Sequence, residues 1–217
     1  MHKAHEHLMI GVFLSLLGGF LDAYTYVLKD GVFANAQTGN LVLLSLSVLS
    51  GHLSNIIKYL IPILMFALGI FLSEVLKGHK RWLENNQGIK LVILFEAILI
   101  VIIALLGPWV NHSVINSTIS FLAAVQVANF NKIKGSPIAT TMITGNLRST
   151  MTGLAHYLQT KDRQYIEQVG TYLVVILTFA LGAVLGGSLS HLWQDKAILV
   201  GLVFLLGAYI ILLKEEK

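Results

Sequence analysis

Apolar residues run along this chain in long stretches that short polar segments interrupt. Several of the stretches approach or exceed the roughly 20 residues that cross the hydrocarbon core of a bilayer. The pattern predicts eight helical elements, at residues 8–28, 32–50, 56–76, 90–107, 113–131, 137–158, 166–190 and 197–213. We therefore predict an all-α polytopic membrane protein with a single membrane domain over residues 1–217.

Composition agrees with this interpretation. Of the 217 residues, 55% are hydrophobic and 12% are charged, against about 25% charged residues in an ordinary soluble domain. A soluble enzyme and a nucleic-acid-binding domain are thereby excluded. Membrane topology is a sufficient explanation for the net charge of +4, so the charge does not indicate a nucleic-acid partner. The chain has no cysteine, so disulfides, thiolate metal sites and cysteine nucleophiles are absent.

The chain contains an internal repeat. Residues 59–76 and 172–189 agree at 10 of 18 positions without a gap. Thr38-Gly39-Asn40 is matched by Thr144-Gly145-Asn146, and a leucine follows each copy. These matches pair the first element with the fifth, the second with the sixth and the third with the seventh. We therefore predict two homologous halves, residues 8–107 and 113–213.

The distribution of Lys and Arg bears on how the two halves face. If all eight elements cross, the basic residues divide eight to six between the two sides of the membrane. If the first two elements of each half make one net crossing, because one is re-entrant or broken near Thr-Gly-Asn, nine lie on one side and Lys58 and Lys196 on the other. The positive-inside rule favours this second arrangement. It has six net crossings, inverted repeats as in many secondary transporters, and cytoplasmic termini. Eight transmembrane helices with parallel halves are the alternative.

Asp22 and Arg148 are ionisable residues inside apolar elements. A charge in hydrocarbon is costly unless it is paired, protonated or in contact with water, so such residues are functional candidates. Asp22 follows Gly18-Gly19 and is either a proton or cation coupling site or a buried structural carboxylate. The guanidinium of Arg148 cannot lose its charge and needs an anion, backbone carbonyls or a water-filled cavity. We expect Arg148 to pair with Asp22, since each would remove the other's desolvation cost.

The two Thr-Gly-Asn segments have the residue types of a helix start. Thr and Asn side chains cap free backbone N–H groups, and Gly permits a left-handed turn. A break near mid-membrane would turn unpaired N–H groups and the positive helix ends toward an anion or a polar solute. Alternatively, both segments cap ordinary spanning helices at an interface. Gln126 and Asn129 add polar groups around the second copy. The candidate substrate-binding or ion-binding residues are therefore Asp22, Thr38, Gly39, Asn40, Gln126, Asn129, Thr144, Gly145, Asn146 and Arg148.

The sequence has no metalloprotease, serine hydrolase or P-loop motif, so we expect no catalytic residue, metal or cofactor and no enzymatic activity. Expected partners are the lipid bilayer, a small polar solute or ion, and a second copy of the chain through its Gly-rich helix faces. The leading hypothesis is a transporter or channel. A non-transporting membrane scaffold or assembly partner is the alternative.

Several motifs together resemble the YoaK family of bacterial integral membrane proteins. They are Gly19-Phe20-Leu21-Asp22-Ala23, Gly31-Val32-Phe33, Thr38-Gly39-Asn40-Leu41, Gln126 with Asn129, and Thr140-Thr141-Met142-Ile143-Thr144-Gly145. The resemblance covers nearly the whole chain. It implies a multi-pass protein of the cell inner membrane or plasma membrane. The family is classed as of unknown function, so the resemblance supplies no substrate.

Overall fold

Long apolar helices form the frame of the protein in a computed structural model, which describes residues 4–78, 87–138 and 140–215. Within these ranges, four helical stretches are long and apolar enough to cross a membrane. They are α1 (Leu8–Leu28), α3 (Leu53–Lys77), α5 (Gln87–Leu106) with the short helix η3 (Gly107–Trp109), and α8 (Arg163–Trp193) with η4 (Gln194–Leu199) and α9 (Val200–Glu215). The predicted all-α polytopic membrane fold is confirmed.

Three further helices complete the bundle: α2 (Gln37–Leu49), α6 (His112–Asn129) and α7 (Ile143–Thr160). The 3-10 turn η1 (Ala4–Glu6) precedes α1. The 13 residues of α2 extend about 20 Å, too short for a hydrocarbon core of about 30 Å. The predicted helices at 32–50 and 137–158 begin too early, because non-helical chain runs up to Ala36 and Met142. Each Thr-Gly-Asn segment lies in the first turn of its helix.

After α1 and α6, the chain turns through residues with left-handed backbone before it reaches α2 and α7. Asp30 and Gly31 have φ of 63° and 69°, and Lys134 and Gly135 have φ of 49° and 77°. Two successive left-handed residues are typical of a tight turn in which the second position favours glycine. In the second half this turn joins two short antiparallel strands, β1 (Lys132–Ile133) and β2 (Ser136–Pro137), which the sequence pattern does not predict.

Glycines bring the central helices into backbone contact. Helix α1 packs along α8, and α3 packs along α6. A Cβ on Gly182 or Gly186 of α8 would collide with backbone atoms of α1, at Leu16 and Phe20. A Cβ on Gly69 of α3 would lie 2.8 Å from the Phe121 carbonyl oxygen of α6. The small-residue patterns of α3 and α8 therefore serve helix packing inside one chain.

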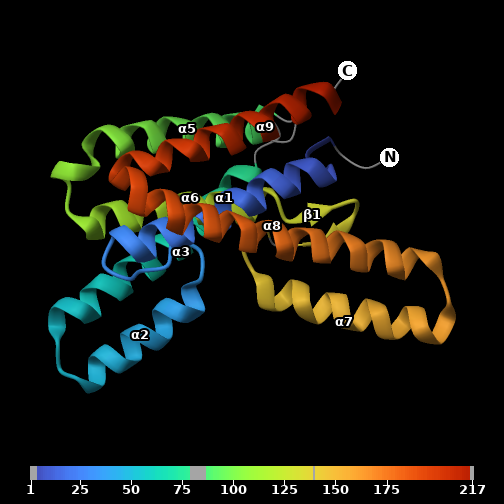
Figure 1. Cartoon of the computed structure of the whole chain (residues 1–217), viewed down its shortest axis with the longest axis horizontal. Coiled ribbons are helices and arrows are strands. Elements are labelled where there is room, and N and C mark those ends of the chain that lie inside the picture. The colour runs from blue at the N-terminus through green and yellow to red at the C-terminus, as the bar shows by residue number, and fades with distance from the viewer. Residues whose placement is uncertain (1–3, 79–86, 139, 216–217) are drawn as a thin grey trace.

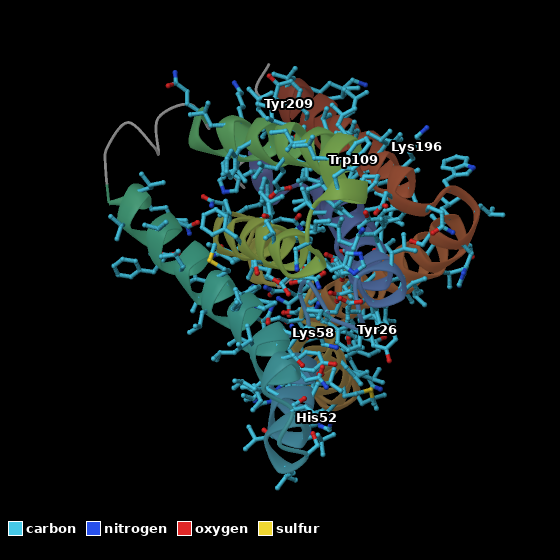
Figure 2. The ribbon with its side chains drawn as sticks, turned by 90° about the vertical axis from the view of Figure 1, so that its left-hand side faces the viewer. Tyr26, His52, Lys58, Trp109, Lys196 and Tyr209 are labelled. Carbon is cyan, nitrogen blue, oxygen red and sulfur yellow. The ribbon has the colours of Figure 1, made fainter. Side chains whose placement is uncertain are left out.

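The elements are arranged along one long axis (Figure 1). The start of α1, the end of α9 and the turn between α7 and α8 lie at one end, and the turn between α2 and α3 lies at the other. Figure 2 turns this second end toward the viewer, with His52 near the lower tip, Lys58 above it, and Trp109 and Lys196, from η3 and η4, in the upper part. The hairpins α2–α3 and α7–α8 thus point in opposite directions.

The outward faces of the long helices are apolar. Large hydrophobic side chains are exposed along α3 and α8, for instance Leu64, Leu68, Phe71, Leu72, Leu173, Leu177, Leu181 and Val184. In water, a surface of this extent would be strongly unfavourable, whereas lipid tails solvate it. The protein is therefore located in a membrane and contacts the bilayer through these faces.

Candidate functional site

A cavity of about 650 Å³ lies between the first turns of α2 and α7. Helix α1 contributes Asp22 to its wall, and the residues around both helix starts contribute polar groups. Aromatic and aliphatic side chains form the rest. The lining residues are Asp22, Ala23, Tyr26, Val27, Phe33, Asn35, Ala36, Gln37, Thr38, Phe66, Thr141, Met142, Ile143, Thr144, Gly145, Phe179 and Ala183. One space therefore unites both Thr-Gly-Asn segments with the membrane-level carboxylate.

Asp22 anchors the loop that precedes α2. Its side chain is buried, and its Oδ1 accepts a hydrogen bond from the Asn35 backbone N–H at 2.6 Å. The Asn35 amide donates in turn to the Gly18 carbonyl oxygen, at 2.9 Å, one helical turn before Asp22. A carboxylate that accepts backbone N–H groups at a helix start also offsets the positive end of that helix. The start of α2 thus has an acceptor supplied by the protein itself.

Asn40 holds the same loop from the other side. Its Oδ1 accepts from the Phe33 N–H at 3.0 Å, and its Nδ2 donates to the Phe33 carbonyl at 2.7 Å and to Gln37 Oε1 at 2.9 Å. The ring of Phe33 packs beside Gly39, where a Cβ would lie 3.0 Å from the ring edge. Because its amide is fully engaged with the loop, Asn40 supports the cavity wall and does not line it.

The second half builds its wall differently. Gln126 is buried in α6 and donates to the Thr140 hydroxyl and to the Leu14 carbonyl, each at 3.3 Å. Thr141 follows on the cavity wall with 5% of its surface exposed, and its hydroxyl has no hydrogen-bond partner within the described residues. Met142 precedes α7 and provides no side-chain cap. Within the described residues, no side chain caps the N–H groups at the start of α7.

The predicted site residues divide into three groups. Asp22, Thr38, Thr144 and Gly145 line one cavity. A second group does not line the cavity and consists of Gly39 and the buried residues Asn40, Gln126, Asn129 and Asn146. Arg148 forms the third group by itself. Three polar residues from the same segments line the cavity without being among the expected ligands: Asn35, Gln37 and Thr141.

The expected ion pair between Asp22 and Arg148 does not form. Asp22 accepts a hydrogen bond from the Asn35 N–H instead. Arg148 is exposed and lines a separate groove of about 280 Å³ between α7 and α8, together with His156, Tyr165 and Gln168. The two side chains therefore line different spaces, and packing keeps them apart.

A family comparison covers nearly the whole chain. Residues 10–211 match the model of a family described as protein of unknown function, DUF1275. The chain belongs to this family. It is also 20% identical over 177 residues to the UPF0700 transmembrane protein YoaK of Bacillus subtilis (strain 168), covering 79% of each chain. No solved structure matches the chain. The resemblance to the YoaK family is confirmed, and this member of the DUF1275 family is a membrane protein.

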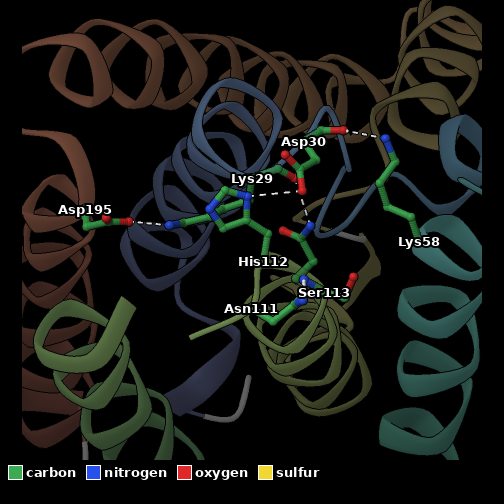
Figure 3. Close-up of polar contacts among 8 residues, drawn as sticks. Lys29, Asp30, Lys58, Asn111, His112, Ser113 and Asp195 are labelled. Atoms are coloured by element: carbon green, nitrogen blue, oxygen red, sulfur yellow. Dashed lines mark hydrogen bonds and ion pairs between the residues drawn. The ribbon is translucent and has the colours of Figure 1, made fainter. Parts of the chain in front are cut away.

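This DUF1275 chain contains a buried ion pair that the sequence analysis missed. Lys29, directly after α1, bonds through its Nζ to Asp195 of η4 (Figure 3). The Tyr24 hydroxyl donates to the same carboxylate at 3.3 Å, and Asn116 of α6 donates to the Lys29 carbonyl at 2.8 Å. The available signal was position, since both charges lie at breaks between apolar elements.

A looser set of contacts continues this cluster toward the surface. His112 Nδ1 lies 3.1 Å from Asp30 Oδ2, and Lys58 of α3 donates to the Asp30 carbonyl at 2.9 Å (Figure 3). Asn111 caps the start of α6 by accepting from the Ser113 N–H at 2.8 Å. These contacts tie the loop after α1 to α3 and α6, the two helices that flank it.

The chemistry available in the cavity is that of binding. Over residues 4–78, 87–138 and 140–215 no group of three or more His, Asp or Glu residues is placed to hold a metal ion. The cavity wall offers a carboxylate, hydroxyls and amides, the N–H groups at the start of α7, and a large apolar surface. Pockets that bind small molecules in proteins combine polar groups and apolar surface in the same way.

Proposed function

We propose that this protein is a membrane transporter or channel for a small polar solute or ion, and not an enzyme. The observation that carries the proposal is the single cavity lined by Asp22 and by the first turns of α2 and α7. Short helices that begin at membrane level provide N–H groups and a positive end for a polar solute, which hydrocarbon cannot provide. Asp22 is the proposed coupling or counter-ion carboxylate.

An inverted repeat supports a transport role. Helix α1 of the first half packs on α8 of the second, and α6 of the second packs on α3 of the first. Gly69 and Gly182, which are matched residues of the internal repeat, make the close contacts in these two interfaces. The α2–α3 and α7–α8 hairpins point in opposite directions (Figure 1). In the proposed topology, residues 8–107 and 113–213 each cross three times in opposite senses.

Both termini are placed in the cytoplasm by this proposal, with the protein in the plasma membrane or inner membrane. The α7–α8 turn, with Lys161 and Arg163, then lies on the cytoplasmic side and Lys58 and Lys196 on the other, as the positive-inside rule favours. Lys3, Lys80, Arg81 and Lys217 also enter the charge argument and lie outside the described residues.

Water access to the cavity tests the function. The natural chain has no cysteine, so Thr38→Cys and Thr144→Cys each introduce a unique thiol on the cavity wall. A thiol in water ionises and reacts with a methanethiosulfonate reagent, whereas a thiol in lipid does not. We expect both variants to react in membrane vesicles. Leu147→Cys, on the exposed surface of α7 and outside the cavity, is the matched control that stays unreactive.

The scaffold alternative gives the opposite result. If the polar residues only hold the two halves together, water does not reach the cavity in the membrane, and the Thr38 and Thr144 variants are as unreactive as the Leu147 variant. If neither cavity thiol reacts, in folded protein and with reagent supplied on both sides, transport through this site is excluded.

A further inference from the structure

The two short helices that meet at the cavity differ in charge compensation. At α2, the Asp22 carboxylate accepts from the Asn35 N–H and supplies a negative charge at the positive helix end. At α7, the preceding helix α6 contributes Gln126, which is neutral and bonds to Thr140. Among the described residues, the start of α2 has a carboxylate beside it, whereas no acidic side chain lies in the first turn of α7.

The start of α7 also has an unused donor and open space. Thr141 is 95% buried and lines the cavity, and its hydroxyl has no hydrogen-bond partner within the described residues. A buried hydroxyl without a partner is costly, so an occupant that accepts a hydrogen bond from it is favoured. Beside it, a Cβ on Gly145 would meet no atom within 4 Å. A bound group therefore has room at the N–H groups of this turn.

Aromatic side chains complete the cavity between these polar ends. Tyr26 and Phe33 stack with ring centroids 4.8 Å apart, and Phe66 and Phe179 come from α3 and α8. Asp22 is the single charged side chain among the described lining residues. The wall thus combines a negative group, a positive helix end and a broad apolar surface.

We propose that the cavity binds a small zwitterion of the amino-acid class, with its carboxylate at the start of α7, its ammonium at Asp22 and its apolar side chain against the aromatic wall. The carboxylate supplies at α7 the acceptor that Asp22 supplies at α2. This inference rests on the proposed function and names its substrate class.

Charge balance separates this ligand from its nearest alternatives. A simple organic anion at α7 would be repelled by the Asp22 carboxylate in a poorly screened site. A simple organic cation at Asp22 would leave the α7 N–H groups and the Thr141 hydroxyl without an acceptor. A zwitterion satisfies both ends and adds no net charge at membrane level.

Binding of three matched compounds to the purified full-length protein tests the inference. The compounds are L-phenylalanine, 2-phenylethylamine, which lacks the carboxylate, and 3-phenylpropanoate, which lacks the ammonium. L-leucine, isopentylamine and 4-methylpentanoate form a second set with an aliphatic side chain. Titration calorimetry gives the dissociation constants. We expect one or both amino acids to bind at least about tenfold more tightly than either matched compound, because each of these loses one charged hydrogen-bonding group.

Two variants assign the two ends of the ligand. Thr141→Val keeps the shape of the side chain and removes the hydroxyl, so it weakens binding of the amino acid about tenfold and leaves binding of the amine unchanged. Thr118→Val is the control, because the Thr118 hydroxyl bonds to Val114 of its own helix and lies outside the cavity. Asp22→Asn removes the preference for the zwitterion over the simple acid. If Asp22→Asn does not fold, comparison of Thr141→Val with its control Thr118→Val still tests where the carboxylate of the ligand binds.

Several results overturn the inference. Equal binding of the amine and the amino acid identifies a cation site, and equal binding of the acid identifies an anion site. If none of the six compounds binds, the amino-acid class is excluded as the substrate. Reactive thiols at Thr38 and Thr144 without amino-acid binding leave the transport proposal standing and refute the substrate class. Amino-acid binding with unreactive thiols refutes transport and retains the ligand.

Discussion

Lys29 and Asp195 form an ion pair between positions 166 residues apart in the chain. Lys29 ends α1 and is buried, with 2% of its side chain exposed, while Asp195 lies at the break between α8 and α9 with 24% exposed. Tyr24 donates to the same carboxylate. The pair therefore joins the loop before α2, which forms part of the cavity wall, to the opposite half of the protein.

Replacing Lys29 tests how much this ion pair contributes to the stability of the protein. Lys29→Met keeps the length of the apolar stem and removes the charge, which leaves a partly buried carboxylate with Tyr24 as its remaining polar contact. We expect a loss of about 2–4 kcal/mol in stability, since breaking one side of a buried pair is strongly destabilising. Thermal or SDS-induced unfolding of the purified protein in detergent measures the loss.

Lys196→Ala is the control for that experiment. Lys196 is adjacent to Asp195 in sequence but exposed, so its removal changes stability by less than about 0.5 kcal/mol. The double variant Lys29→Met with Asp195→Leu recovers much of the loss, because it leaves no unpaired charge. Equal effects of the Lys29 and Lys196 variants would show that the pair contributes no specific stability.

Two adjacent glycines of α8 predict opposite effects of the same substitution. A Cβ on Gly186 would collide with the Phe20 backbone of α1, whereas a Cβ on Gly187 meets no atom within 4 Å. Gly186→Ala therefore costs about 1–3 kcal/mol through overpacking. Gly187→Ala is neutral or stabilising by up to about 1 kcal/mol, because alanine favours the helix. Melting temperatures of the two variants are compared, and a loss for Gly187→Ala as large as for Gly186→Ala would contradict the packing.

Replacing Asn40 is expected to affect the loop before α2 locally. Asn40→Ala removes the partners of the Phe33 N–H and carbonyl and costs about 1–3 kcal/mol. Amide hydrogen exchange of residues 29–36 rises, because the loop loses its connection to α2. Ser45→Ala is the control on the same helix, since the Ser45 hydroxyl is exposed and bonds only to Leu41 of α2. Unchanged exchange in the Asn40 variant would assign the loop's order to Asp22 alone.

Cysteine labelling decides the direction of the two halves. His52 lies at the α2–α3 connection and Thr160 at the matched α7–α8 connection, at opposite ends of the structure (Figure 1). In the inverted topology, a membrane-impermeant reagent labels His52→Cys in intact cells and reaches Thr160→Cys only after permeabilisation. Labelling of both variants from the same side would establish parallel halves. It would also make the Thr-Gly-Asn segments ordinary helix caps.

The sequence predicted the breaks of this fold better than the helix boundaries beside them. Asp30-Gly31 and the segment at Gly135 were recognisable from residue type, because left-handed backbone favours glycine. Residues 32–36 are largely apolar, so the pattern predicts a helix there, although the structure shows them to be non-helical. Hydropathy reports that a residue is buried and does not report how its backbone hydrogen bonds are made.

By itself, the sequence determined the membrane setting and the helical class, because these depend on local composition. It also indicated Asp22 and the two Thr-Gly-Asn segments as candidates, because charge and free backbone groups are costly in hydrocarbon. Only the tertiary structure decided which charges meet. Asp22 accepts a hydrogen bond from a backbone N–H thirteen residues away, Lys29 pairs with Asp195 in the other half, and Arg148 is exposed. Pairing depends on the distance between atoms that packing brings together, and sequence separation carries no information about that distance.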